Sequence, residues 1–248
     1  MVKKFLMLPK ISVNKAVVLF SGGVDSTLVT YLCKLYDVDY IAVTIDAEAI
    51  PRREIEYAKK IAKELEFNHT IIKISQLEIS EFVKNTIDRC YYCKKIMLSR
   101  INEEFEGYPI LDGTNKDDFN EFRPGLKAIK EFNVICPLKD LSKVEVRTLA
   151  KNLGLPNWNK PSNSCLATRI KGEITLDKIK MIEKAEDFLY NLGFKIVRVR
   201  LECENARIEV GKDELERLFK MREIVTQKLK DIGFKRISLD LEGYRKVV

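Results

Sequence analysis

The sequence lacks several features that would place the chain in a familiar class. It has a single histidine, His69, and no run reaches the roughly 18 to 20 consecutive apolar residues that a membrane span needs. The basic start continues into only a few apolar residues without a small-residue cleavage site, so we expect no signal peptide. We therefore expect a cytoplasmic protein with no membrane partner. In that compartment structural disulfides are disfavoured among the six cysteines.

The charge of the chain is positive without being concentrated in one block. Hydrophobic residues make up 46% of the chain, enough to bury a core, and the formal net charge is +7. Such a balance permits anionic partners, including nucleotides, phosphates and RNA. The basic residues do not form a stripe with interleaved aromatics, as RNA-binding surfaces often do. Charge alone does not decide between these partners.

Short apolar runs alternate with helical patterns through the first two thirds of the chain. This rhythm predicts a doubly wound α/β fold with a parallel sheet, whose strands we expect at 16–20, 40–45, 69–74 and 110–111. The stretch 155–169 is rich in proline and asparagine, which indicates a linker or an ordered loop. After it we expect a helix at 176–192, a hairpin, one long amphipathic helix and a closing strand. We therefore predict a first domain over 1–169 and a smaller α+β domain over 170–248.

The motif SGGVDS at positions 21–26 follows the first strand and opens a helix. Gly22 and Gly23 allow backbone N–H groups to approach an anion, and the hydroxyls of Ser21 and Ser26 add donors near the positive end of the helix. Asp25 would act through Mg²⁺, because a carboxylate does not favour an anion by itself. No Gly-Lys-Ser/Thr follows, so the loop is not a Walker A motif. The motif predicts an ATP phosphate site.

Three of the cysteines stand out from the other three. Cys90 and Cys93 form a CxxC pair, and Cys165 lies in an irregular, polar segment close to Arg169, where a thiol is more reactive than in a core. A closed zinc site normally needs four Cys or His ligands, and there is no second CxxC. Three thiolates can instead hold a [4Fe–4S] cluster and leave one iron without a protein ligand, which could carry sulfur. Ligand type alone leaves a cluster, persulfide or disulfide chemistry, zinc, and no joint role all open.

The motifs SGGVDS, RCYYCKK, LDGTNKDD, KPSNSCLATRI, RVR, RIEV and LEGYR run along nearly the whole chain. Together they resemble the LarE-type sulfurtransferases of nickel-pincer nucleotide cofactor biosynthesis, within the PP-loop ATP pyrophosphatase superfamily. The resemblance implies that a carboxylate of a pyridinium dicarboxylate mononucleotide is adenylated by ATP and converted to a thiocarboxylate. One branch sacrifices the cysteine that corresponds to Cys165, and a second branch carries an added CxxC and uses a cluster. Cys90 and Cys93 match the second branch.

The resemblance also implies site residues and a homo-oligomer that takes sulfur from sulfide or a carrier. Cys165 and Asp25 are the expected catalytic residues, and Cys90, Cys93 and Cys165 the expected cluster ligands. Polar residues after the fourth strand are expected near the nucleotide, because ligands of doubly wound sheets bind at the carboxyl ends of strands. The expected ATP-binding set is Ser21, Gly22, Gly23, Asp25, Ser26, Asp112, Thr114 and Arg169. A further phosphate and metal group would comprise Arg198, Arg200, Arg245, Glu186 and Glu209.

The sequence leaves three other functions open. A tRNA-thiolating enzyme of the same superfamily is the main alternative; the charge permits it, but no added RNA-binding module is visible. An amidotransferase-like ligase, such as an NAD or GMP synthetase, would deliver ammonia and would not need the three cysteines. A regulatory protein that binds a nucleotide without turnover would release neither AMP nor pyrophosphate.

Overall fold

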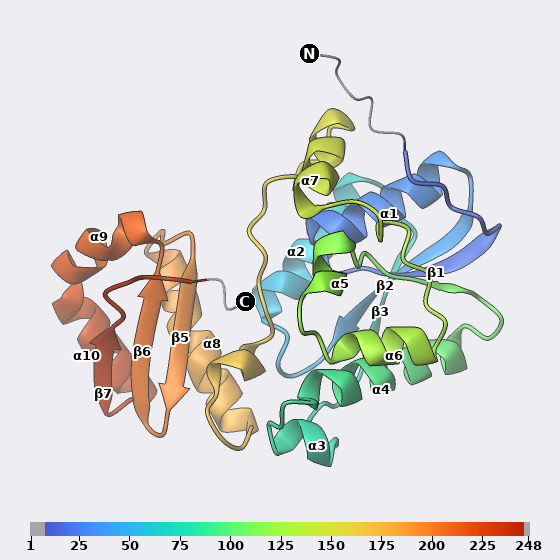
Figure 1. The fold of residues 1–248 in the computed structure, drawn as a ribbon. Helices are drawn as coiled ribbons and strands as arrows, with labels where there is room; N and C mark the ends of the chain where they lie inside the picture. Colours follow the sequence, from blue (N-terminus) through green and yellow to red (C-terminus); the bar gives the residue numbers. More distant parts are fainter. Residues whose placement is uncertain (1–7, 246–248) are drawn as a thin grey trace. The chain divides into compact units, whose positions relative to one another are not determined.

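The computed structural model describes residues 8–245, which form two compact units. The first unit contains residues up to Ser75 together with Ile87–Ser162, and the second contains Gln76–Thr86 together with the chain from Asn163 onward. The last crossing of the chain from the first unit to the second therefore lies between residues 162 and 163, whereas the sequence-based boundary follows residue 169. Each unit is described by itself below (Figure 1).

The first unit is built on a parallel four-stranded sheet in the order β3-β2-β1-β4. Its strands are β1 (Lys15–Leu19), β2 (Asp39–Asp46), β3 (His69–Lys73) and β4 (Ile110–Leu111). Successive side chains of a strand point to opposite faces, so Ala16 and Val18 enter one core while Val17 enters the other. A strand buried on both faces needs the continuous apolar run that the sequence shows there. This confirms the predicted doubly wound α/β fold.

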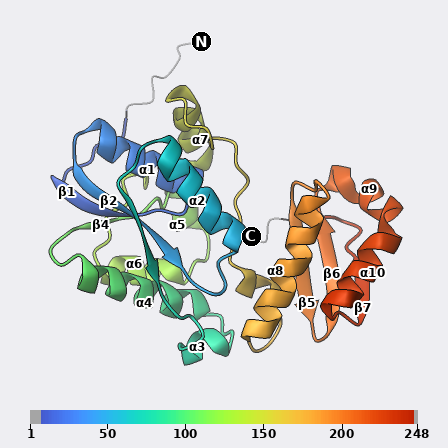
Figure 2. The same cartoon turned by 180° about the vertical axis from the view of Figure 1, so that it is seen from behind.

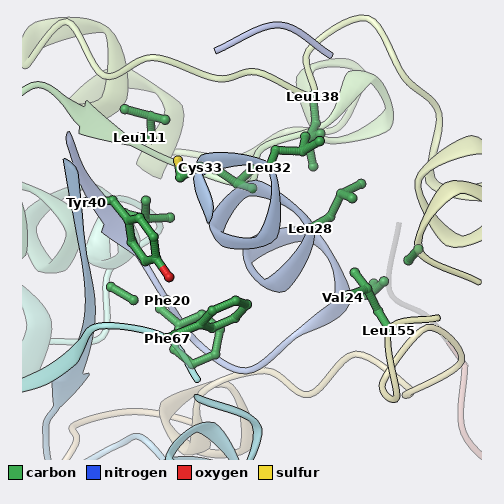
Figure 3. Packing of buried hydrophobic residues seen from close by; sticks show 14 of the residues in the cluster. Phe20, Val24, Leu28, Leu32, Cys33, Tyr40, Phe67, Leu111, Leu138 and Leu155 are labelled. Carbon is green, nitrogen blue, oxygen red and sulfur yellow. The ribbon is translucent and has the colours of Figure 1, made fainter. Parts of the chain in front are cut away.

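Helices cover both faces of this sheet. One face packs on α1 (Val24–Leu35), α2 (Arg52–Glu64) and α7 (Lys143–Asn152), and the other on α4 (Arg89–Glu104) and α6 (Gly125–Glu131). The short helix α5 (Lys116–Asn120) follows β4. In Figure 3 the side chains of Leu28, Leu32 and Cys33 project from α1 into the first core. Phe20 and Phe67 meet there edge to face, with ring centroids 5.8 Å apart.

The second unit has a mixed three-stranded sheet in the order β5-β6-β7. The strands β5 (Val197–Glu202) and β6 (Asn205–Val210) form the predicted hairpin, and β7 (Arg236–Leu239) pairs parallel to β6. The helices α8 (Leu176–Asn191) and α10 (Arg222–Ile232) pack on the sheet, as Figure 2 shows from behind. The short helix α3 (Ser80–Val83) and the 3₁₀ turn η1 (Leu166–Arg169) also belong to this unit.

One predicted element of the second unit is wrong. The single long helix expected after β6 is three pieces: a 3₁₀ turn, η2 (Lys212–Glu214), then α9 (Leu215–Lys220), then α10. The break falls at Met221, whose backbone N–H donates to the carbonyls of Arg217 and Leu218 at 3.2 and 3.0 Å. The i to i−3 bond tightens the last turn of α9. The sequence pattern stays amphipathic across the break, which is why it predicts one helix.

Candidate active site

The SGGVDS loop joins β1 to α1 and has the geometry of an anion cradle. Gly22 has φ +67°, and a Cβ on it would lie 2.8 Å from the Cα of Ala58 in α2. The hydroxyl of Ser26 donates to the carbonyl of Gly23 at 3.1 Å and accepts from the backbone N–H of Ser21 at 3.2 Å. Gly23 is the N-cap of α1 without a side-chain cap. The positive end of α1 and the two serine hydroxyls therefore converge on one loop, which favours a phosphate.

Asp25 in the first turn of α1 carries two partners from distant parts of the first unit. The Nδ2 group of Asn115 donates to Oδ1 at 3.3 Å, and the ammonium of Lys143 at the start of α7 contacts Oδ2. Asn115 also caps α5 in a capping box with Asp118. Burial and then the nearby Asp25 carboxylate raise the pKa of Asp118, against the opposing effects of the Asn115 N–H and Arg123. Two carboxylates thus lie beside the phosphate loop, and each is ion-paired in this structure, Asp25 with Lys143 and Asp118 with Arg123.

The turn after β4 packs directly against the phosphate loop. A Cβ on Gly113 would lie 2.8 Å from the backbone nitrogen of Ser26. Before it, Asp112 accepts from Lys94 at 2.7 Å and from the N–H of Thr114 at 2.8 Å. Burial alone would raise the pKa of Asp112, but the Lys94 ammonium and the hydrogen bonds from Lys94 and Thr114 outweigh it and lower the pKa. The structure therefore places Asp112 and Thr114 beside the loop, with Asp112 held ionised.

Asn157 is a site residue that the sequence did not reveal. It lies in the proline- and asparagine-rich stretch after α7, is 1% exposed, and donates to the carbonyl of Gly22 at 2.9 Å and to Oγ1 of Thr27 at 2.8 Å. It therefore holds Gly22 in its left-handed conformation through the carbonyl oxygen. The only sequence signal is an asparagine in an irregular stretch, which is too common to single out.

Cys90 and Cys93 lie in the first turns of α4, three positions apart and so on one side of the helix. Cys90 is exposed and Cys93 is buried. The next residue, Lys94, reaches Asp112, so the helix that carries the CxxC pair is tied to the turn beside the phosphate loop. The structure thus brings the CxxC helix, the β4 turn and the SGGVDS loop together within the first unit.

Of the three cysteines outside the predicted trio, Cys33 is buried, Cys136 is half-buried and Cys203 is exposed. Burial raises the pKa of the Cys33 thiol to about 12, in agreement with its expected place in the core. Burial, and next the Asp112 carboxylate, raise the pKa of Cys136 to about 12 as well. Cys203 is exposed at the β5–β6 turn with φ +57°. The two high pKa values keep Cys33 and Cys136 protonated and unreactive at neutral pH.

Cys165 belongs to the second unit, where it immediately precedes η1 and is half-buried. Arg169, expected at the nucleotide, is fully buried and pairs with Glu186 of α8, Nε to Oε1 3.0 Å. Burial has the largest effect on Arg169 and lowers its pKa, while Glu186 opposes the change. The carboxylate of Glu186 also accepts from the N–H of Val199 at 3.1 Å. Arg169 and Glu186 are thus bonded to groups inside the second unit. These contacts do not support the expected roles of Arg169 as a nucleotide ligand and of Glu186 as a metal ligand.

The expected phosphate group lies on the sheet face that carries the even-numbered side chains of β5. Arg198 is 4% exposed, with its guanidinium carbon 4.9 Å from the ring centre of Tyr244. Arg200 forms a two-pronged ion pair with Glu209, and a third residue, Arg207, also reaches Glu209, at 2.8 Å. Arg245 is more exposed and pairs with Asp240 and Glu242. Because two arginines share the Glu209 carboxylate, this donor set does not fit a metal ion.

Two features are absent from the part of the chain that the structure describes. Between residues 8 and 245, no group of three or more His, Cys, Asp or Glu side chains is arranged to hold a metal ion. Over the same range, no helix combines the length and apolar character that crossing a membrane requires.

Comparison with known proteins agrees with this architecture. The family model described as queuosine biosynthesis protein QueC matches residues 15–90, the segment with the phosphate loop. The pyridinium-3,5-bisthiocarboxylic acid mononucleotide synthase of Lactiplantibacillus plantarum is 36% identical, over 94% of this chain and 87% of its own. An uncharacterised protein of Synechocystis is 35% identical over 94% and 90%. One subunit of the glutamine-hydrolysing GMP synthase of Sulfurisphaera tokodaii is 31% identical but spans 69% of this chain and 52% of its own. The chain therefore belongs to the family of the pyridinium-3,5-bisthiocarboxylic acid mononucleotide synthase, within the PP-loop ATP pyrophosphatase superfamily.

Proposed function

We propose that this protein is an ATP-dependent sulfurtransferase that converts a carboxylate of a pyridinium mononucleotide to a thiocarboxylate. The observation that carries the proposal is the similarity to the L. plantarum synthase over 94% of the chain, which spans both units. The phosphate loop, with its serines, its left-handed glycine at φ +67° and the open end of α1, supports the use of ATP.

The first step is adenylation. A carboxylate oxygen of the substrate attacks the α-phosphorus of ATP, pyrophosphate leaves, and an acyl adenylate forms. Ser21, Ser26 and the N–H groups of the loop would bind the phosphates, and Asp25, with Asp118 nearby, would hold the Mg²⁺ that accompanies ATP. Lys143, which contacts Asp25, balances the charge of that carboxylate when no cation is bound.

The second step is attack by sulfur. Sulfide adds to the activated carbonyl carbon, the bond to the adenylate oxygen breaks, and AMP leaves with that oxygen, so no oxidant or reductant is consumed. We propose that Cys90, Cys93 and Cys165 would be the ligands of a [4Fe–4S] cluster, which when bound would supply the sulfide. Three thiolates suit such a cluster while leaving one iron open. The pairing of Cys90 with Cys93 on one side of α4 and the place of Cys165 in an irregular segment support this assignment.

The substrate phosphate is proposed to bind at the arginine face of the second unit. Arg198, Arg200 and Arg245 have the planar, forked donors that suit phosphate. Arg245, whose side chain is 56% exposed, is the most accessible of the three. From the family resemblance we also propose a homo-oligomer and a substrate-binding role for the second domain.

The experiment combines the anaerobically purified protein with ATP, Mg²⁺, sulfide and the pyridinium dicarboxylate mononucleotide. We expect AMP, pyrophosphate and thiocarboxylate in equal amounts, measured by chromatography and mass spectrometry. Asp25→Asn should suppress all three products, because the adenylation step depends on it. Cys165→Ser should suppress thiocarboxylate, whereas Cys203→Ser, a matched control in the same unit, should change nothing.

The other outcomes separate the alternatives. Thiolated nucleosides formed on added tRNA would favour a tRNA-thiolating enzyme. An amide product from ammonia, unaffected by Cys165→Ser, would favour an amidotransferase-like ligase. Absence of AMP and pyrophosphate with every acceptor would reject an adenylating enzyme.

A further inference from the structure

Arg169 and Glu186 form a buried ion pair in the second unit. Both side chains are 0% exposed. Removing two charges from water costs several kcal/mol per ion and is offset only when good geometry and further hydrogen bonds satisfy the remaining groups. A pair of apolar side chains could fill the same space at a lower desolvation cost. We therefore look for the role of the ion pair in the other hydrogen bonds that Arg169 and Glu186 make.

Most of the guanidinium contacts go to the segment around Cys165. One terminal nitrogen shares its two N–H donors among four surrounding oxygens: the carbonyl and hydroxyl of Ser164 at 3.0 and 2.6 Å, the carbonyl of Cys165 at 3.1 Å and Oγ1 of Thr168 at 2.7 Å. The other donates to Oδ1 of Asn163 at 3.0 Å. The segment Asn163–Thr168 therefore wraps around a single guanidinium.

The carbonyl of Cys165 is the most heavily bonded point of this segment. Besides Arg169, it accepts from the N–H of Thr168 at 3.1 Å and from its hydroxyl at 2.8 Å. Three donors on one carbonyl fix the backbone at Cys165 and so restrict the positions open to its Sγ atom. Each hydrogen bond from a charged donor is stronger than a neutral one.

Glu186 connects this segment to the body of the unit. Its Oε1 atom accepts both from Arg169 and from the N–H of Val199 in β5, and Glu186 itself lies in the middle of α8. A helix and a strand thus hold the carboxylate, the carboxylate holds the guanidinium, and the guanidinium holds the cysteine segment.

We propose that the Arg169–Glu186 pair positions Cys165 for sulfur transfer, with Arg169 acting as a positioning residue and not as a nucleotide ligand. The link to sulfur transfer rests on the proposed function. Lysine would not replace Arg169, because its ammonium lacks the planar fork that reaches Glu186 and the cysteine segment together.

The test compares Arg169→Lys and Thr168→Val with Arg222→Lys, a matched change at an exposed ion pair of the same unit. Hydrogen exchange is measured for the peptide that covers 163–169 and, as a fold control, for β5 and β6. Alkylation of Cys165 by iodoacetamide is measured by peptide mass spectrometry relative to Cys203 in the same molecule. In Arg169→Lys we expect about tenfold faster exchange of the segment and a severalfold higher Cys165/Cys203 alkylation ratio, with β5 and β6 unchanged.

Thr168→Val keeps the ion pair but removes the three contacts of the Thr168 hydroxyl, to Ser164, Cys165 and Arg169, so the same changes should appear in smaller size. If Arg169→Lys also speeds hydrogen exchange in β5 and β6, the Thr168→Val variant decides whether the hydrogen bonds of the segment position Cys165. In the sulfur-transfer assay both variants should form AMP while the yield of thiocarboxylate per AMP falls, and Arg222→Lys should behave as wild type. Segment exchange and alkylation equal to those of Arg222→Lys in folded Thr168→Val would overturn the positioning role. These two readouts need no substrate, so they stand apart from the proposed function.

Discussion

Replacing Gly22 with alanine tests whether the phosphate loop needs a residue without a Cβ at this position. A residue with a Cβ in the left-handed region costs about 1–2 kcal/mol, and Gly22 has φ +67°. The new Cβ would also lie 2.8 Å from the Cα of Ala58, so the loop or α2 must move; overpacking of this kind costs about 1–3 kcal/mol. Alanine returns about 0.4–1 kcal/mol by restricting the unfolded chain. We therefore expect a net loss of about 1–4.5 kcal/mol in the free energy of unfolding.

Gly154→Ala is the matched control, because Gly154 lies in the same unit with φ +74° and nothing within 4 Å of the added Cβ. Gly154→Ala has only the backbone cost, about 0–1.5 kcal/mol once the restriction of the unfolded chain is subtracted. Urea denaturation gives both free energies, and titration calorimetry gives ATP affinity, which we expect to fall about tenfold or more only in Gly22→Ala. Equal stability and equal ATP affinity of the two variants would refute the inferred contact with α2.

Three further predictions concern other parts of the first unit. Asp112→Asn should destabilise the protein at pH 7. Folding lowers the pKa of the Asp112 carboxyl, so its ionised form stabilises the folded protein at pH values above the unfolded pKa. The difference in the free energy of unfolding between variant and wild type should therefore shrink as the pH falls below about 4. Denaturation across pH measures this. Asn157→Ala removes two buried hydrogen bonds, including the one to the carbonyl of Gly22, and should cost about 1–3 kcal/mol of stability and weaken ATP binding. Cys33, with its pKa raised to about 12, should resist iodoacetamide at pH 8 in the folded protein, while the exposed Cys203 reacts.

Each of these has a contrary outcome. A stability difference for Asp112→Asn that stays constant down to pH 3 would contradict the lowered pKa. Unchanged ATP affinity in Asn157→Ala would show that this side chain does not support the loop. Rapid labelling of Cys33 at low denaturant would contradict its place in the core.

The parts of the fold that the sequence predicted are those set by neighbouring residues. The apolar run before SGGVDS, the glycine pair and the helical pattern after it are contiguous, so strand, loop and helix follow from one stretch. The Cys33 core position and the β5–β6 hairpin likewise depend on local patterning. The split of the long helix at Met221 was missed because helical periodicity continues through it.

The contacts that complete the site join residues far apart in the sequence. Lys143 reaches Asp25 across 118 positions, and Asn157 reaches the carbonyl of Gly22 across 135. No local pattern marks such pairs. Arg169 shows a second difficulty: a charged residue in a polar loop is more often exposed or bound to a ligand, and only the packed structure shows that it is buried against Glu186. The sequence shows that Arg169 is charged, but it does not show that Glu186 is its partner.

The central claim, that a substrate carboxylate is adenylated before sulfur attacks, is tested most directly with substrate labelled with ¹⁸O in the carboxylate. When one carboxylate oxygen attacks ATP and later leaves with AMP, each thiocarboxylate formed should place one ¹⁸O atom in the phosphate of AMP, read by mass spectrometry. Thiocarboxylate formed alongside unlabelled AMP would contradict the account.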